Sequence, residues 1–200
     1  DPQRLAELVA MVRTKVAPDE RATIEAFVAA YYGKVDPEDL ADHPLADLYG
    51  AALSHFNLGR KRLPGHARVR VSNPAIEDQG WQSTHTIVEI VNDDMSFLVD
   101  SVTMEANRHG LTLHLIVHPI IGVTRAADGT LTGVTAEGAA GGQRESFIHV
   151  EVDRVSGHAA LEAFATDVAR VLADVRSAVA DWKAMQDTAP ERRILRIEAH

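Results

Sequence analysis

Near residue 67 the spacing between apolar residues changes from about 3.6, the period of a helix, to 2, the period of a strand. A chain with both periods is neither all-helical nor all-β, so we expect a helical part followed by a part that contains a sheet. The predicted organisation is a helical lead-in over residues 1–66, an α+β domain over 67–190 and the start of a further segment over 191–200.

Three helices are predicted in the lead-in. The third should begin with Asp36 as its N-cap and Pro37 at its first helical position, and its apolar face should include Leu48 and Phe56. From residue 84 the predicted order is strand 84–91, helix 97–109, strand 111–117, strand 147–152, a long helix 161–185 and a last strand from Ile194. A hairpin is expected at Asp128-Gly129, and a mobile loop at 138–142. This order is the βαββαβ pattern of a ferredoxin-like sandwich: an antiparallel sheet with its helices on one face.

Alternation assigns the strand residues to two faces of this sheet. Six apolar residues should lie under the helices: Val88, Ile90, Leu113, Leu115, Ile148 and Val150. The other face is predicted to be open, and it collects four histidines and two carboxylates: His85, Ile87, Glu89, His114, Ile116, His118, Phe147, His149 and Glu151.

An open apolar and histidine-rich face is most often an interface, so we expect it to dock on another domain or subunit. A metal site, a proton relay and a solvated face are the alternatives. The spacing argues against a metal, because His114 and His118 would lie roughly 13 Å apart along one strand.

The loop between strand 84–91 and the next helix is the candidate binding site. It contains Asn92, Asp93, Asp94, Met95, Ser96, Phe97 and Leu98. The free N–H groups at a helix N-terminus bind a carboxylate well, and a nearby aspartate can bind an ammonium group. Together they suit a free amino acid. The alternative is that Asp94 or Ser96 only caps the helix.

Several classes of function are excluded or disfavoured. The absence of cysteine rules out disulfides, thiolate zinc sites and a cysteine nucleophile. A formal net charge of −9 argues against nucleic acid and anionic membranes as partners. No dinucleotide fingerprint, P-loop, H-E-x-x-H or G-x-S-x-G motif occurs, so we expect no catalytic residues and no cofactor or metal of the chain's own. A start without Met and a stop within a strand-like pattern suggest a piece of a longer chain.

Longer stretches of the sequence resemble the N-terminal part of the large NAD-specific glutamate dehydrogenases of bacteria. The resemblance spans roughly residues 27–155 and rests on stretches 47–52, 69–74, 80–91, 93–102, 114–119 and 145–154. It implies a parent polypeptide that begins with ACT-type modules, whose fold is a βαββαβ sandwich. The parent would convert glutamate to 2-oxoglutarate and ammonia with NAD, at a catalytic domain far downstream.

The resemblance also implies a role for this chain: a non-catalytic regulatory or assembly module of a cytoplasmic homo-oligomer. Its partners would be the rest of the parent chain, other subunits and a free amino acid. Ligand-binding ACT loops read Asp-x-Pro-Gly-Leu-Leu, and Met95 and Ser96 stand here at the proline and the glycine. A purely structural interaction domain and a histidine-based metal-binding module are the alternatives.

Overall fold

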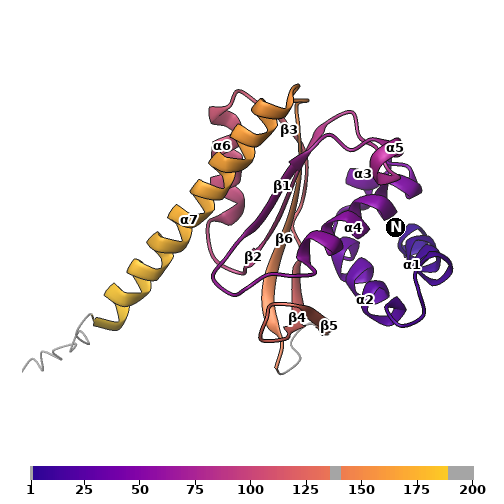
Figure 1. Ribbon diagram of the computed structural model, residues 1–200, viewed down its shortest axis with the longest axis horizontal. Coiled ribbons are helices and arrows are strands. Elements are labelled where there is room, and N and C mark those ends of the chain that lie inside the picture. The colour runs from indigo at the N-terminus through magenta and orange to yellow at the C-terminus, as the bar shows by residue number, and fades with distance from the viewer. Residues whose placement is uncertain (1, 136–140, 189–200) are drawn as a thin grey trace, which may run out of the picture.

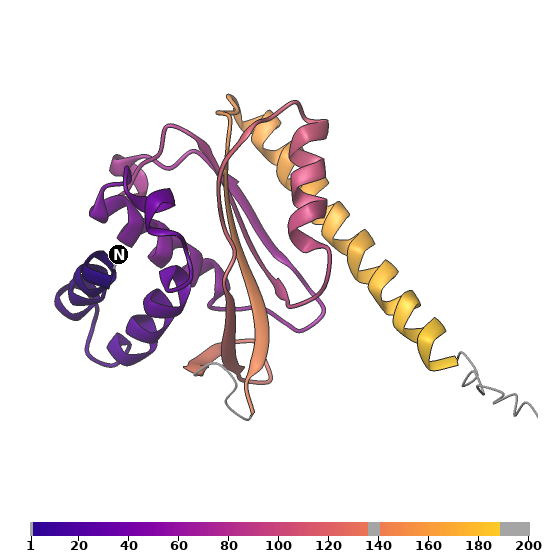
Figure 2. The same ribbon diagram turned by 180° about the vertical axis from the view of Figure 1, so that it is seen from behind.

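The computed structural model describes residues 2–135 and 141–188. The sheet lies between two helical layers (Figures 1 and 2). In chain order the elements are α1 (Pro2–Lys15), α2 (Arg21–Tyr32), α3 (Pro37–Leu40), α4 (Leu45–Gly59), β1 (Arg68–Ser72), α5 (Ile76–Gln79), β2 (Thr86–Asp93), α6 (Leu98–Arg108), β3 (Leu113–Val117), β4 (Ile120–Arg125), β5 (Leu131–Thr135), β6 (Gln143–Val152) and α7 (His158–Thr188).

Within the described residues the strands form one six-stranded sheet in the order β1-β2-β6-β4-β5, with β3 also paired to β6. Every pairing is antiparallel. The long strand β6 holds the sheet together, since β2 lies along one edge and β3 and β4 share the other. The prediction of an α+β fold with an antiparallel sheet, consistent with the ACT class, is confirmed.

Helices α6 and α7 cover one face of the sheet, as the alternation predicts (Figure 1). Their apolar stripes bury Val102, Phe164 and Val168 against Val88 and Ile148 of the strands. Burial of apolar surface of this kind is the main source of stability, at about 25 cal/mol for each Å² removed from water.

The opposite face is not open, so that part of the prediction is wrong. The N-terminal helices pack against it (Figure 2), and Phe27 of α2 and Phe56 of α4 share a core with Val91 and Phe147 of the sheet. The rings of Phe27 and Phe147 lie 5.1 Å apart, centroid to centroid. The physical reason is that the lead-in helices carry apolar stripes of their own, and docking on the sheet buries both surfaces at once.

The assignment of β3 to the two faces is also wrong in part. A register shift between Leu113 and Leu115 places Leu113 in the α6–α7 core, whereas Leu115 packs on the N-terminal side. Ile116, predicted for the open face, pairs with Val150 of the α6–α7 face instead. A bulge adds one residue to one strand, so every side chain beyond it changes face.

The predicted third helix is two helices. Asp36 is the N-cap of α3 and its carboxylate accepts a hydrogen bond from the backbone N–H of Glu38. The helix ends at Leu40, however, and α4 begins after Pro44, because the residue before a proline is disfavoured in helical conformation. The hairpin at Asp128-Gly129 is confirmed. The predicted loop 138–142 lies largely outside the described residues, and the segment 191–200 with the strand from Ile194 lies wholly outside them.

Candidate functional site

The predicted binding loop begins within β2, whose last residues are Asn92 and Asp93, and the Asp93 carboxylate is already bound within the chain. Arg62 Nη2 lies 2.8 Å from Asp93 Oδ1, and Arg176 Nη1 lies 2.6 Å from Asp93 Oδ2. The backbone N–H of Gly65 donates to Oδ2 as well. Burial opposes ionisation of this carboxyl, but the hydrogen bonds from Arg62 and Arg176 outweigh it and lower the pKa of Asp93 to about 2. Asp93 is therefore an anion whose two oxygens both have cationic partners.

Arg62 is itself fixed by a buried ion cluster. Its guanidinium is completely buried and contacts Glu145 Oε2 at 2.5 Å, while Arg125 Nη2 contacts Glu145 Oε1 at 2.7 Å. A buried charge is stable only when it is paired and hydrogen-bonded, and here each member of the cluster is. Arg62 stands in the basic run Arg60-Lys61-Arg62, but nothing in the local sequence indicates its contact with Glu145, 83 residues away.

The rest of the loop is held in a similar way. Asn92 Oδ1 accepts a hydrogen bond from Arg176, and Asp94 pairs with Arg144 at 3.2 Å. The apolar residues Met95 and Leu98 pack into the α6–α7 core, and Ser96 is exposed. The capping alternative for Asp94 or Ser96 is wrong, because the N-cap of α6 is Phe97 and no side-chain capping hydrogen bond is made there among the described residues.

Phe97 has an unusual backbone conformation. Its φ is 70°, in the left-handed region, and it is the one described residue other than glycine with a positive φ. The aromatic ring is also largely exposed. A bulky residue in this region costs free energy that its surroundings must supply.

A second group forms between the sheet and the N-terminal layer, around Glu151. Three imidazoles surround this carboxylate: His85 Nδ1 at 3.1 Å, His43 Nε2 at 3.3 Å and His149 Nε2 at 3.4 Å. The ring of His114 stacks on that of His85, with centroids 4.1 Å apart. The structure thus brings together His85, His114, His149 and Glu151 of the predicted face and adds His43.

Other members of the predicted face do not join this group. Ile87, Glu89 and Phe147 are buried beneath the N-terminal helices, and His118 lies near Asp94 and Ser146. His43 was missed because it stands in the turn between α3 and α4, 108 residues from Glu151. A histidine in a loop gives no signal that it docks on a sheet so far away in sequence.

The group around Glu151 lines a cavity of about 560 Å³ between the helices and the sheet. Burial opposes ionisation of Glu151, but hydrogen bonds from His149 and His43 hold the pKa of this carboxyl well below its usual range. The hydrogen bond to Glu151 raises the pKa of His43 in turn, against the effect of burial. A carboxylate is thus held among imidazoles in a partly buried hollow.

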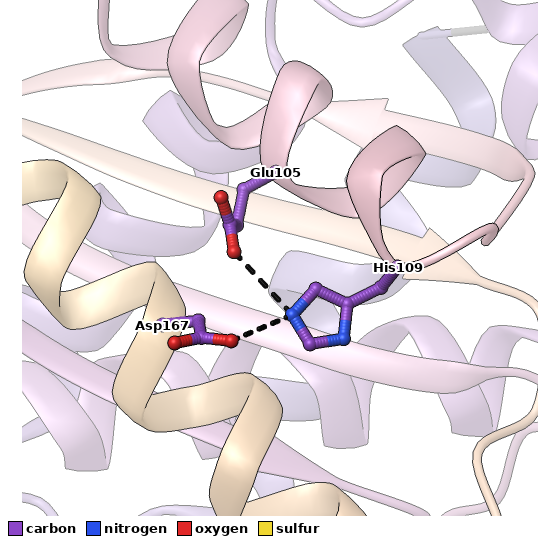
Figure 3. Close-up of side chains that lie close together, drawn as sticks. All are labelled: Glu105, His109 and Asp167. Atoms are coloured by element: carbon purple, nitrogen blue, oxygen red, sulfur yellow. Dashed lines mark hydrogen bonds and ion pairs between the residues drawn. The ribbon is translucent and has the colours of Figure 1, made fainter.

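A third group ties α6 to α7. His109 Nε2 lies 3.3 Å from Glu105 Oε1 and 2.8 Å from Asp167 Oδ2 (Figure 3). In the part of the chain that the structure describes, this is the one set of three His, Asp or Glu residues whose possible metal-ligand atoms lie within 4.8 Å of one another. Arg108 pairs with both carboxylates and Arg170 lies beside them. The arginines supply the positive charge that a metal ion would bring, so the arrangement is that of an ion-pair network between two helices.

Among the described residues, none of the helices combines the length and the apolar character that a membrane span requires.

Comparison with known proteins gives a consistent result. Residues 27–168 match the family model of the glutamate dehydrogenase ACT1 domain. The chain is 41% identical over 187 residues to the NAD-specific glutamate dehydrogenase of Halomonas elongata. The matched stretch is 92% of this chain and 12% of the relative. The corresponding enzyme of Pseudomonas aeruginosa is 36% identical over 167 residues, or 82% of this chain and 10% of the relative.

The NAD-specific glutamate dehydrogenase of Mycobacterium tuberculosis is more distant, at 29% identity over 140 residues, which is 69% of this chain and 8% of that protein. The chain thus spans about a tenth of the length of the curated relatives it matches. With a family model matched over most of the sequence and a relative more than 30% identical over nearly all of it, this chain belongs to the family of the glutamate dehydrogenase ACT1 domain.

Proposed function

We propose that this chain is a non-catalytic assembly module of a large NAD-specific glutamate dehydrogenase. The parent polypeptide would oxidise glutamate to 2-oxoglutarate and ammonia with NAD in a domain outside this chain. The family match and the names of the relatives support the parent activity. The expected cytoplasmic location stays a prediction.

The observation that favours the assembly role over sensing is that Asp93 and Asp94 of the predicted binding loop already have arginine partners within the chain. Both oxygens of Asp93 are held by arginines from elsewhere in the fold, and Asp94 pairs with Arg144. An amino acid would have to displace a guanidinium to place its ammonium group on Asp93. Because a hydrogen-bonded charge pair in a partly buried site is costly to break, the loop favours fold maintenance over ligand binding.

The far half of α7 supports the same role. Phe164, Val168 and Leu172 of this helix are buried, but Trp182 and Met185 farther along are exposed. Large exposed apolar side chains are typical of contact surfaces. We propose that they meet other parts of the parent chain or other subunits of a homo-oligomer.

Amino-acid sensing is the second candidate function. It is favoured by the position of α6, whose N-terminus follows Asp93 and Asp94 as the sequence predicts, and by the partial exposure of Arg176. In this case a ligand would take the place of Arg176 on Asp93, and its carboxylate would face the first turn of α6.

Calorimetric titration of the chain with the common amino acids, glutamate included, separates the two functions. The assembly role predicts no binding heat and no rise in melting temperature with any of them. Binding that disappears in Asp93→Asn but persists in the matched surface variant Asp128→Asn would establish sensing at this loop instead.

A second assay tests the non-catalytic part of the proposal. The chain is incubated with glutamate and NAD, and NADH is followed by its absorbance. We expect no glutamate-dependent formation of NADH. Turnover above that of a heat-denatured sample would contradict the proposal as a whole.

A further inference from the structure

We propose that the cavity around Glu151 binds a divalent transition-metal ion of the zinc or cobalt type, through the imidazoles of His43, His85, His114 and His149. This inference is independent of the proposed function, because it rests on a different part of the molecule from the loop after β2. Four histidines from separate segments line this cavity: the α3–α4 turn, the residue before β2, β3 and β6.

The charges around the cavity select a cation. Three carboxylates, Asp42, Asp47 and Glu151, line it, and none of the described residues that line it is a lysine or an arginine. Arg4 lies next to the cavity and donates to the backbone carbonyl oxygen of His43, so the carboxylates still outnumber the arginines there. The cluster of Glu105, His109 and Asp167 has the opposite character, because Arg108 and Arg170 already neutralise it. A cation therefore gains more from the cavity than from that cluster.

The imidazoles select a transition metal among cations. Imidazole nitrogen is a ligand for zinc, cobalt, nickel and copper, whereas calcium and magnesium prefer oxygen. Each of these rings also has one nitrogen on a carboxylate: His43, His85 and His149 on Glu151, and His114 on Asp153 at 2.7 Å. Metal-binding histidines are held in this manner, with the second nitrogen left for the ion.

Two of the second nitrogens lack any partner. Nδ1 of His43 and Nδ1 of His149 are buried, and no hydrogen bond to either atom exists among the described residues. His149 is only 3% exposed. A buried polar atom without a partner is costly, and an ion or a water molecule at the site is the usual explanation.

Binding requires some of the rings to turn. The ring nitrogens are spread around the Glu151 carboxylate, and no three of them form a set within 4.8 Å in the described structure. The side chains of His43, His85 and His114 are 29%, 32% and 37% exposed, so they have room to rotate toward a shared ion. His149 lines the same cavity but is nearly completely buried, so the other rings would have to turn toward it.

The experiment uses the chain without a polyhistidine tag, after dialysis against a chelator and then chelator-free buffer. Zn²⁺ and Co²⁺ are titrated separately, with calorimetry for both ions and visible absorption for Co²⁺. We expect a single ion per chain, a Co²⁺ absorption band typical of nitrogen ligation, and a higher melting temperature with either ion.

Three variants decide where the ion binds. His85→Gln with His114→Gln removes two partly exposed ligands, and Glu151→Gln removes the charge that holds the rings; each should weaken Zn²⁺ binding about tenfold or more. The matched control His109→Gln should bind as the wild type does. Absence of binding in the wild type, binding that is lost only in His109→Gln, or binding that all variants retain would overturn the proposal. Circular dichroism confirms that each variant is folded, so that a loss of binding reports on the site.

Discussion

His55 should make the stability of this protein depend on pH below neutrality. It is completely buried between α4 and the sheet, where its Nε2–H donates to the carbonyl oxygen of Ile90 at 2.8 Å. Its Nδ1 then accepts the hydroxyl of Tyr31 at 2.7 Å. The bond from Tyr31 needs the neutral ring, because a protonated Nδ1 cannot accept it, and burial lowers the pKa of His55 to about 4.

The sign of the effect follows from linkage. An unfolded histidine has a pKa of about 6.5, so the unfolded chain takes up a proton between pH 6.5 and 4 that the folded chain does not. The contribution of neutral His55 to the free energy of unfolding should therefore be fully present above pH 6.5 and should fall as the pH is lowered toward 4. For these two pKa values the loss attributable to His55 is about 2 kcal/mol between pH 7.5 and pH 5.

Urea unfolding of the wild type and of His55→Gln at a series of pH values measures this loss. The variant should be less stable at pH 7.5, by about 1–3 kcal/mol, because Tyr31 or Ile90 loses a partner in a buried place. Its stability should also change less with pH, since the titrating ring is gone and the other histidines remain in both proteins. Parallel pH profiles for the two proteins would refute the reasoning.

Three further substitutions test other parts of the fold, each by chemical denaturation. Arg62→Met leaves the completely buried Glu145 with Arg125 as its one arginine partner among the described residues, and should cost about 3–5 kcal/mol; a cost below about 1 kcal/mol would contradict the buried cluster. Phe97→Gly should stabilise the chain by about 0.5–1 kcal/mol by relieving the left-handed backbone, whereas a loss would mean that the ring packs. Gly129→Ala should cost more than about 1 kcal/mol, because the new Cβ would lie 2.7 Å from the carbonyl oxygen of Arg62 at a φ of 87°; an unchanged midpoint would argue against this turn.

Features that depend on a few neighbouring residues could be predicted from the sequence. Alternation along β2 separates Val88 and Ile90 from Ile87 and Glu89. The first pair packs in the α6–α7 core, and the second pair is buried on the opposite face, beneath the N-terminal helices. The cap at Asp36 and the turn at Gly129 were also recognisable, since each depends on the chemistry of a few neighbouring residues.

The remainder depends on contacts between distant segments. The face around Phe147 was expected to be open because no local pattern shows that α2 and α4 fold back on it. The register shift after Leu113 has no proline or glycine to mark it, although it moves Ile116 to the other face. The site around Glu151 was incomplete for the same reason: His43 reaches it only after the helical layer has docked.

The candidate loop shows what a motif leaves undetermined. The sequence places Asp93 and Asp94 at a strand end before a helix, and the structure has them there. The ion-pair partners of Asp93 come from distant segments: Arg62 from the loop before β1, and Arg176 from the middle of α7. Their presence changes the interpretation of Asp93 from a free ligand group to one half of an ion pair.

Light scattering on a full-length dehydrogenase that carries this module tests the assembly role most directly. The mass of the intact enzyme is compared with that of the enzyme from which the module has been deleted, and NADH formation is measured for both. The assembly role predicts a smaller oligomer after deletion and retained capacity to oxidise glutamate. An unchanged mass with altered response to free amino acids would contradict it and would assign the module to sensing.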